Sequence, residues 1–209
     1  MYISISQIKT ANASLAKRAW EKILWITQQR ESDSLDLGNM FEHYLINKED
    51  AYDRFLQNIT DKEKFIATYD ALKHNAIGLE VPEWDYQYKV ESELFWCPFI
   101  GYIDIRQKEC LYDIKTIYRT WDIDGKNVNH WSWLTYLEEY ELQMRAYMKT
   151  TWIKKSKILA VWKFLYADKR NDNRVLDIDR SDELDARMTA KIWPLVEQMQ
   201  TLYSKHKWT

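Results

Sequence analysis

Apolar residues in the first third of the chain recur at the three- and four-residue spacing of amphipathic helices. A helix is predicted over 13–29, with four apolar residues on one face: Leu15, Ala19, Ile23 and Ile26. A second helix is expected to begin near Asp36, a good N-cap residue, and to turn four side chains inward: Met40, Phe41, Tyr44 and Leu45. A third helix is predicted from Thr60, because Thr60-Asp-Lys-Glu63 is a capping box, and to end near Gly78.

After Pro82 the pattern changes to the period of two that is typical of strands. Three consecutive strands are predicted over 86–91, 99–105 and 110–117, and a short polar turn at 107–109 indicates that they form an antiparallel meander. The remaining elements are a polar loop over 120–129, a long helix over 133–149, strands over 157–165 and 174–179, and a last helix from Ser181.

Length and composition agree with one folded domain. A chain of 209 residues is long enough for one sizeable core and too short for two ordinary domains. Its 46% hydrophobic residues, with 11 Trp, 14 Tyr and 6 Phe, argue against intrinsic disorder. We therefore predict a single α/β domain over 1–209 with a mixed sheet and flanking helices. Its parts are a helical region of about 1–80, the sheet and its helix over about 84–180, and a C-terminal helix over about 181–206.

The cysteine content and the lack of a membrane span or secretory signal predict a cytoplasmic protein in a reducing compartment. No apolar run is long enough to span a bilayer, and the first residues lack the basic and apolar segments of a secretory signal. The two cysteines, Cys97 and Cys110, are too few for a disulfide framework or an iron–sulfur cluster. The formal net charge of −2 gives no global attraction to nucleic acid, although metal-binding carboxylates would offset a basic groove elsewhere.

Two acids and a lysine are expected to meet on one face of the predicted meander. Asp113 and Lys115 are two residues apart on a strand, so their side chains share a face, while Ile114 takes the other. The shortest symmetrical turn, centred at 108–109, places Asp104 directly opposite Asp113. The pattern therefore gathers Asp104, Asp113 and Lys115 into one cluster.

Such a cluster suits metal-assisted cleavage of phosphodiester bonds. Carboxylate oxygens are the hard ligands that Mg²⁺ and Mn²⁺ prefer, and the bound metal lowers the pKa of a water molecule. A lysine can orient that water or offset the charge that develops on the phosphate. Asp-x-Lys alone fits a surface ion pair equally well. The Gly-x-x-Asp sequence that ends at Asp104 on the neighbouring strand favours the metal site.

Three short motifs follow one another along the predicted strands and the long helix: Gly101-x-x-Asp104, Asp113-x-Lys115-Thr116 and Gln143-x-x-x-Tyr147. In order, spacing and predicted secondary structure they resemble the PD-(D/E)xK nuclease superfamily, and most closely its RecB, Cas4 and λ-exonuclease-like branch. The resemblance covers about 38–147 and implies a restriction-endonuclease-like α/β core.

The resemblance also implies roles for individual residues of the two strands. Asp104 and Asp113 would bind the metal ion, the backbone carbonyl of Ile114 would complete the metal site, and Lys115 would be the catalytic lysine. These roles follow from the match of each position to the family's motif.

Residues from two helices extend the implied site. Gly38-Asn-Met-Phe-Glu42 matches the family pattern that brings an acid or a histidine from an earlier helix to the metal, which implies Glu42 as a further ligand and catalytic residue. His43 points about 100° away on a helix, and the spacing favours Glu42. In the family, the glutamine and the tyrosine of this motif line the active-site groove, which implies the same place for Gln143 and Tyr147. An amide within an apolar stripe also needs a hydrogen-bonding partner, which favours a catalytic-site role for Gln143.

Two of the chain's departures from the family narrow the expected function. The chain lacks the iron–sulfur cysteines of Cas4-type members and a helicase-type phosphate loop. We expect a DNA nuclease that depends on Mg²⁺ or Mn²⁺, an exonuclease of a phage or prokaryotic recombination, repair or defence system. A single-strand-binding or recombination protein is a further expected partner, and no oligomeric state is predicted. Two alternatives use the same residues: a restriction-like or junction-cleaving endonuclease, and a catalytically silent module that binds DNA or protein.

Contacts with the substrate are less specific in the sequence. Seven basic residues are candidates for phosphate contacts: Lys17, Arg18, Lys22, Lys149, Lys154, Lys155 and Lys157. Three tryptophans are candidates for stacking on unpaired bases: Trp121, Trp131 and Trp133. Both sets are equally compatible with a solvated face or with core packing. Six other aromatic residues are assigned to packing: Trp20, Trp25, Trp162, Trp193, Tyr136 and Tyr140.

Overall fold

The structure is a computed structural model, and it describes most of the chain after residue 32. The described residues are 3–4, 33–57, 59–83, 85–94, 97–117, 129–163, 165, 171, 173–183, 185–186, 188–190, 193–194, 196–197 and 201. The helix predicted over 13–29 lies outside these residues, and so does the predicted loop except for its last residue, Asn129. Asn129 already belongs to the long helix, which therefore begins four residues before the predicted start at 133.

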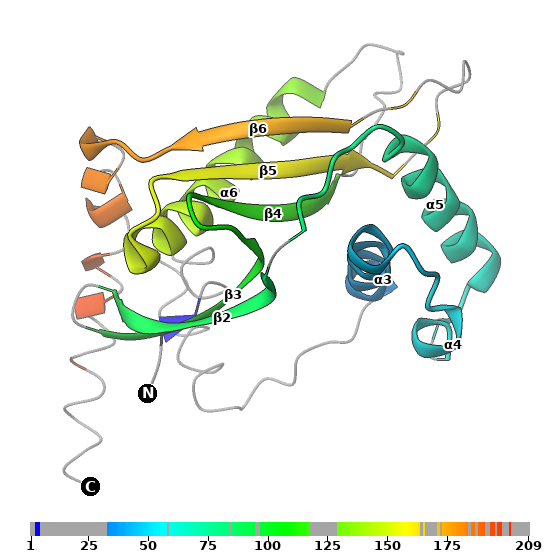
Figure 1. Cartoon of the computed structure of the whole chain (residues 1–209), viewed down its shortest axis with the longest axis horizontal. Helices are drawn as coiled ribbons and strands as arrows, with labels where there is room; N and C mark the ends of the chain where they lie inside the picture. Colours follow the sequence, from blue (N-terminus) through cyan, green and yellow to red (C-terminus); the bar gives the residue numbers. More distant parts are fainter. Residues whose placement is uncertain are drawn as a thin grey trace, which may run out of the picture.

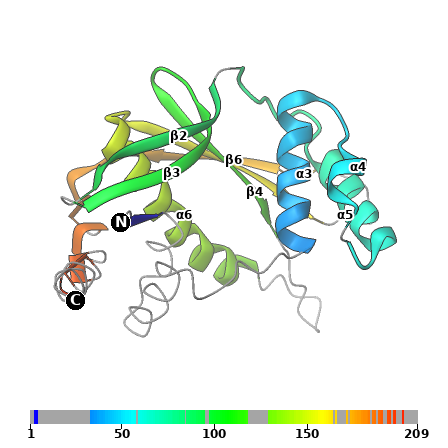
Figure 2. The same cartoon turned by 90° about the horizontal axis from the view of Figure 1, so that it is seen from below.

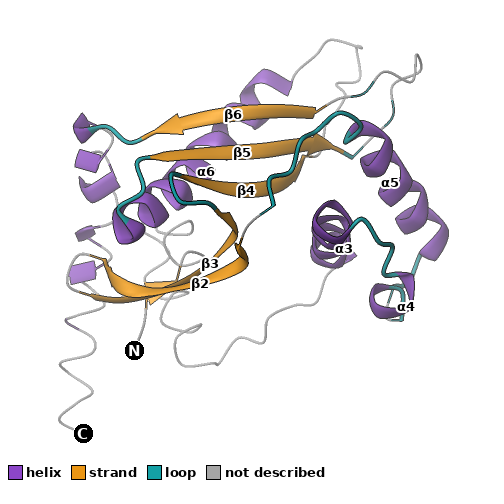
Figure 3. Ribbon diagram, in the orientation of Figure 1, coloured by secondary structure: helices purple, strands orange, loops and turns teal. Residues whose placement is uncertain are grey.

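The helices and strands are shown in Figure 1 and, by type, in Figure 3. The helices are α3 (Asp33–Asn47), α4 (Tyr52–Phe55), α5 (Lys62–Asn75) and α6 (Asn129–Thr151). The strands are β1 (Ile3–Ser4), β2 (Asp85–Leu94), β3 (Cys97–Arg106), β4 (Cys110–Ile117), β5 (Lys155–Trp162) and β6 (Asn173–Asp179). The described residues between 182 and 201 are also helical, as predicted. None of the helices within the described ranges carries an apolar stretch long enough to cross a membrane.

The strands form one mixed sheet, and β3 has neighbours on both of its edges (Figure 2). β2 pairs antiparallel with β3 from Asp85–Arg106 to Leu94–Cys97, with Gln87 left out of the register. On the other edge, β3 pairs antiparallel with β4 at one end and parallel with the short β1 near the other end. β5 runs parallel to β4, and β6 runs antiparallel to β5. The predicted meander and the predicted α/β fold with a mixed sheet and flanking helices are confirmed.

Two apolar clusters cover the two faces of this sheet. One contains Met144 and Met148 of α6, and the other contains Met40 and Phe41 of α3 with residues of α5. β5 contributes to both, because its side chains alternate: Ile158, Ala160 and Trp162 face the first cluster, and Leu159 and Val161 face the second. Trp162 is buried, as predicted, and Trp193 is half-buried. The β4–β5 core therefore lies between α6 on one side and α3 with α5 on the other.

Helix boundaries show where local chemistry overrides the predicted signal. The N-cap of α5 is Asp61 rather than Thr60, because the Asp61 carboxylate accepts a hydrogen bond from the Lys64 backbone at 3.1 Å. α3 begins at Asp33, three residues before the predicted Asp36. Gly78 adopts the predicted left-handed conformation with φ +82°. The four residues of α4 are too few to show a helical period in the sequence.

Within the described residues, three residues other than glycine have positive φ angles. Lys48 (φ +60°) and Trp152 (φ +62°) directly follow α3 and α6, where a left-handed residue commonly ends a helix. Gln87 (φ +49°) lies inside β2, where an extended backbone is the rule. Such a backbone conformation costs roughly 1–3 kcal/mol and persists only where the surrounding structure holds it. The strain at Gln87 therefore needs a reason in its contacts.

Candidate active site

β3 and β4 separate immediately after their shared turn. Only Ile105–Tyr112 and Arg106–Leu111 pair between them, whereas β4 pairs with β5 over eight residues. This is the register predicted from the turn, in which the next pair would be Asp104 with Asp113. At that point the Ile114 N–H donates to Oδ2 of Asp104 at 2.7 Å. A side chain thus takes the place of the backbone partner that the Ile114 amide would have in a continuous ladder.

Asp113 is buried on the α6 side of β4 and is contacted from two directions. Its side chain is 2% exposed, and its Oδ2 lies 2.5 Å from Nζ of Lys115. Gln143 of α6 donates through Nε2 to Oδ1 of Asp113 at 2.9 Å. Ile114 packs in the cluster on the opposite face, so the predicted alternation along β4 is confirmed. The structure brings Asp104, Asp113, Lys115 and Gln143 together.

The charges of this cluster do not balance. Burial raises the pKa of Asp104 well above its ordinary value, and the neighbouring Asp113 charge raises it further, although Lys115 opposes the shift. Burial tends to lower the pKa of Lys115, but the carboxylates of Asp113 and Asp104 outweigh it and raise this pKa above its ordinary value. Lys115 is therefore held as an ammonium among more acids than it can neutralise.

Glu42 approaches the same cluster from α3. It is half-buried, and burial raises its pKa, while a hydrogen bond from Gln87 lowers it. The charge of Lys115 also lowers the pKa of Glu42, and the charge of Asp113 raises it. His43, the weaker candidate, instead contacts Nδ2 of Asn47 one turn along its own helix, at 3.0 Å.

Tyr147 and Gly101 belong to two different motifs and pack against each other. The Tyr147 hydroxyl donates to the carbonyl of Tyr102 at 2.5 Å, and its ring meets Phe99 edge-on at 6.2 Å. A Cβ on Gly101 would lie 2.5 Å from Cε1 of Tyr147. Glycine is therefore needed at the start of Gly-x-x-Asp so that this tyrosine can reach the β3 backbone.

α6 consequently bridges the separated strands. Gln143 reaches Asp113 on β4, and Tyr147, one turn later, reaches the backbone of β3. Tyr140 of the same helix is half-buried, packs against the cluster on this face of the sheet, and lies with its ring centroid 5.4 Å from Nζ of Lys115. One helical face thus fixes how far apart the two strands stand.

The donor set fits a hard divalent cation in its chemistry. Asp113 Oδ2 is buried, and the Lys115 ammonium 2.5 Å away balances its charge there. Carboxylate oxygens with excess negative charge are what Mg²⁺ and Mn²⁺ require. Within the described ranges, however, no three His, Cys, Asp or Glu side chains are already grouped as a metal centre. Binding of a cation would therefore require these side chains to adjust.

Other candidate residues lie apart from this cluster. Lys157 forms an ion pair with Asp177 of β6 at 3.1 Å, and Lys154 and Lys155 are exposed. Lys17, Arg18, Lys22, Trp20, Trp25 and Trp121 lie outside the described residues, and the side chains of Trp131, Trp133 and Tyr136 are not described. The phosphate contacts and the base stacking thus stay predictions.

Comparisons with known proteins identify the fold. No protein-family model matches the chain, and no curated protein matches it. A "Putative exonuclease" from Eubacterium rectale matches with a TM-score of 0.61 and 14% identity over 97% of this chain and 80% of that one. The alkaline exonuclease LHK-Exo of Laribacter hongkongensis, in complex with dAMP, matches with a TM-score of 0.57 and 15% identity over 99% of this chain and 92% of that one.

The chain has the fold of these two exonuclease structures. The fold agrees with the one that the three motifs implied. At 14–15% identity the likeness concerns the fold alone, so the roles of the site residues rest on the geometry described above.

Gln87 is a site residue that the sequence did not indicate. A glutamine at an exposed position of a strand is ordinary, and neither its left-handed backbone nor its partner on α3, 45 residues away, leaves a mark in the sequence pattern.

Gly101→Ala should destabilise the fold by about 1–3 kcal/mol, because Tyr147 is buried and held by two contacts and cannot give way to a new methyl group. Gly38→Ala is the matched control: nothing lies within 4 Å of a Cβ there, and alanine favours a helix by up to about 1 kcal/mol. Urea unfolding measures both changes. A Gly101→Ala protein as stable as wild type would contradict the proposed packing.

Asp104→Asn should raise the melting temperature at neutral pH in the presence of chelator, because it removes a half-buried carboxylate whose ionised form is disfavoured. A raised folded-state pKa means that the ionised group destabilises the fold above that pKa. This penalty fades as the pH falls through the folded pKa toward the unfolded value of about 3.9. The advantage of Asp104→Asn should therefore shrink on acidification. Thermal melts across this pH range test the prediction, and equal melting temperatures throughout would refute it.

Proposed function

We propose that this protein is a metal-dependent DNA nuclease that acts as an exonuclease. The observation that carries the proposal is the cluster of buried Asp113 with half-buried Asp104 and Lys115 at the point where β3 and β4 separate. The fold supports it, since both matched structures are named as exonucleases. The dAMP in the LHK-Exo structure supports DNA as the substrate.

Asp104, Asp113 and the carbonyl of Ile114 would hold Mg²⁺ or Mn²⁺, with Glu42 completing the set from α3. A bound cation would polarise a phosphoryl oxygen and lower the pKa of a bound water molecule. Asp113 is kept in place by the amide of Gln143, so its orientation does not depend on the cation. A ligand fixed in this way loses little conformational freedom when the cation binds.

Lys115 acts on the scissile phosphate rather than on the cation. An ammonium has three donors and no lone pair, so it cannot be a ligand. Its raised pKa keeps the ammonium charged at neutral pH. In this form it can orient the attacking water and offset the charge that develops on the phosphate. Tyr147 holds the β3 side of the opening through its hydrogen bond to the Tyr102 carbonyl.

The biological setting that fits this activity is a phage or prokaryotic recombination, repair or defence system. In such a system an exonuclease exposes single-stranded DNA, so a single-strand-binding or recombination protein is the partner that we propose with it.

The decisive test uses end-labelled linear DNA and closed circular DNA, each with Mg²⁺, with Mn²⁺ and with chelator. We expect loss of the linear DNA alone, and only with metal. Cleavage of the circle would instead indicate an endonuclease. Absence of cleavage with retained DNA binding would indicate a catalytically silent module.

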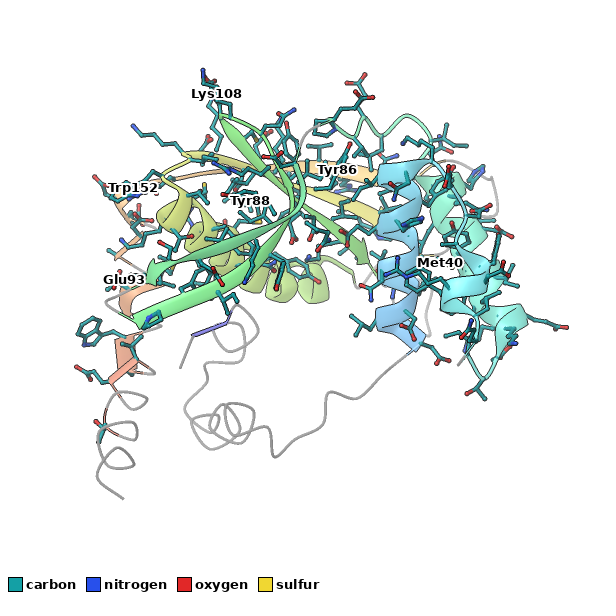
Figure 4. All side chains as sticks on the ribbon, turned by 60° about the horizontal axis from the view of Figure 1, so that its bottom comes forward. Met40, Tyr86, Tyr88, Glu93, Lys108 and Trp152 are labelled. Carbon is teal, nitrogen blue, oxygen red and sulfur yellow. The ribbon has the colours of Figure 1, made fainter. Side chains whose placement is uncertain are left out.

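Lys115→Ala should lower the cleavage rate by about 10²–10³-fold and leave metal affinity nearly unchanged, because the lysine acts mainly in the transition state. Asp113→Asn should lower cleavage and metal affinity together, because it removes a charged ligand. Lys108→Ala is the control, since Lys108 is exposed at the tip of the β3–β4 turn (Figure 4). Wild-type cleavage by Lys115→Ala in saturating Mg²⁺ would remove the lysine from the mechanism.

A further inference from the structure

Gln87 interrupts β2 directly opposite Asp104. The pairs on either side, Tyr86–Ile105 and Tyr88–Ile103, set the register so that Gln87 faces Asp104, yet these two residues do not pair. The left-handed backbone of Gln87, with φ +49°, explains the interruption, because it turns this residue out of the ladder. β3 therefore lacks regular partners on both edges at the level of Asp104.

The side chain of Gln87 leaves the strand and reaches α3. Its amide Nε2 donates a hydrogen bond to Oε1 of Glu42. Tyr86, the preceding residue, packs into the apolar cluster that contains Met40 and Phe41 of α3, so β2 and α3 are adjacent at this point. Figure 4 shows Tyr86 on the stretch of β2 that approaches α3, with Met40 on that helix.

We propose that Gln87 is a positioning residue: its strained backbone aims its amide at Glu42 and holds that carboxylate toward the Asp104, Asp113 and Lys115 cluster. This role rests on the proposed function, because Glu42 matters there as a ligand of the divalent cation. The side chain of Gln87 makes no hydrogen bond to the lysine or to either aspartate within the described residues, so it acts through Glu42.

The strained residue of β2 is also the residue that contacts Glu42. An exposed residue in a regular strand gains nothing from a positive φ, and relaxing Gln87 to an extended backbone would restore its pairing with Asp104. Relaxation would also redirect the amide away from α3. The strain therefore persists where it orders a carboxylate of the site.

The test is Mn²⁺ binding by calorimetry without DNA, together with thermal melting. Gln87→Gly should raise the dissociation constant of Mn²⁺ by about 10–100-fold, as loss of a residue that orients a ligand does. Its melting temperature should stay equal or rise, because glycine adopts a positive φ without strain. Glu91→Gly is the control on the exposed face of the same strand, where the backbone pairs regularly with Ile100. It should melt lower and bind Mn²⁺ like wild type.

A double-mutant cycle separates positioning from direct contact. Glu42→Gln should weaken Mn²⁺ binding, and adding Gln87→Gly to it should cause no further loss. An undiminished loss in the double variant, or no loss in Glu42→Gln, overturns the proposal. Gln87→Asn tolerates the left-handed backbone but is one methylene shorter, and it should bind Mn²⁺ more weakly than wild type. Wild-type affinity in both Gln87 variants also overturns the role.

Asp113→Asn distinguishes the two levels of failure. If Asp113→Asn loses Mn²⁺ binding while Gln87→Gly retains it, the positioning role is wrong and the proposed nuclease site stands. If Asp113→Asn binds Mn²⁺ like wild type, the proposed metal site is wrong, and the role of Gln87 fails with it.

Discussion

The backbone N–H of Ile114 donates to the carboxylate of Asp104 instead of to a carbonyl of β3, and this hydrogen bond marks where the sheet opens. An unpaired buried backbone group costs about 1–3 kcal/mol, so strands separate inside a fold only where other groups replace the ladder. Here Asp104 serves the Ile114 amide, and Tyr147 of α6 serves the Tyr102 carbonyl. Gly101 makes that second contact possible, because any larger residue would occupy the space of the Tyr147 ring.

The opening gathers acids that would repel one another in an ordinary core. Asp104 and Asp113 are brought together with one lysine, which pairs with Asp113, and the raised pKa of Asp104 reflects the cost. Gln87 adds a strained backbone at the same level of the sheet. A divalent cation bound at this place would offset the charge repulsion and so stabilise the fold. The packing of the sheet is in this way connected to a reaction on phosphodiesters.

Much of this arrangement could be predicted from the sequence, because its signals are local. The period of two along β2, β3 and β4, together with the short turn, sufficed for the register that sets Asp104 against Asp113. The apolar surroundings of Gln143 indicated that its amide needs a partner, and Asp113 is that partner. Gln87 could not be predicted, since its role depends on a backbone angle and on a helix distant in sequence. The N-cap of α5 is Asp61 and not the predicted Thr60. Both residue types can cap a helix, so the sequence alone does not decide between them, and the geometry of the first turn does.

The measurement that tests this account most directly is a crystal structure of the protein grown or soaked with Mn²⁺, in which anomalous scattering locates the metal. We expect one Mn²⁺ peak at the opening between β3 and β4, within coordination distance of Asp104, Asp113 and the Ile114 carbonyl. Glu42 is expected to approach it from α3. A Mn²⁺ peak elsewhere, with Asp113 still paired to Lys115 and Asp104 still bound to the Ile114 amide, would contradict the account.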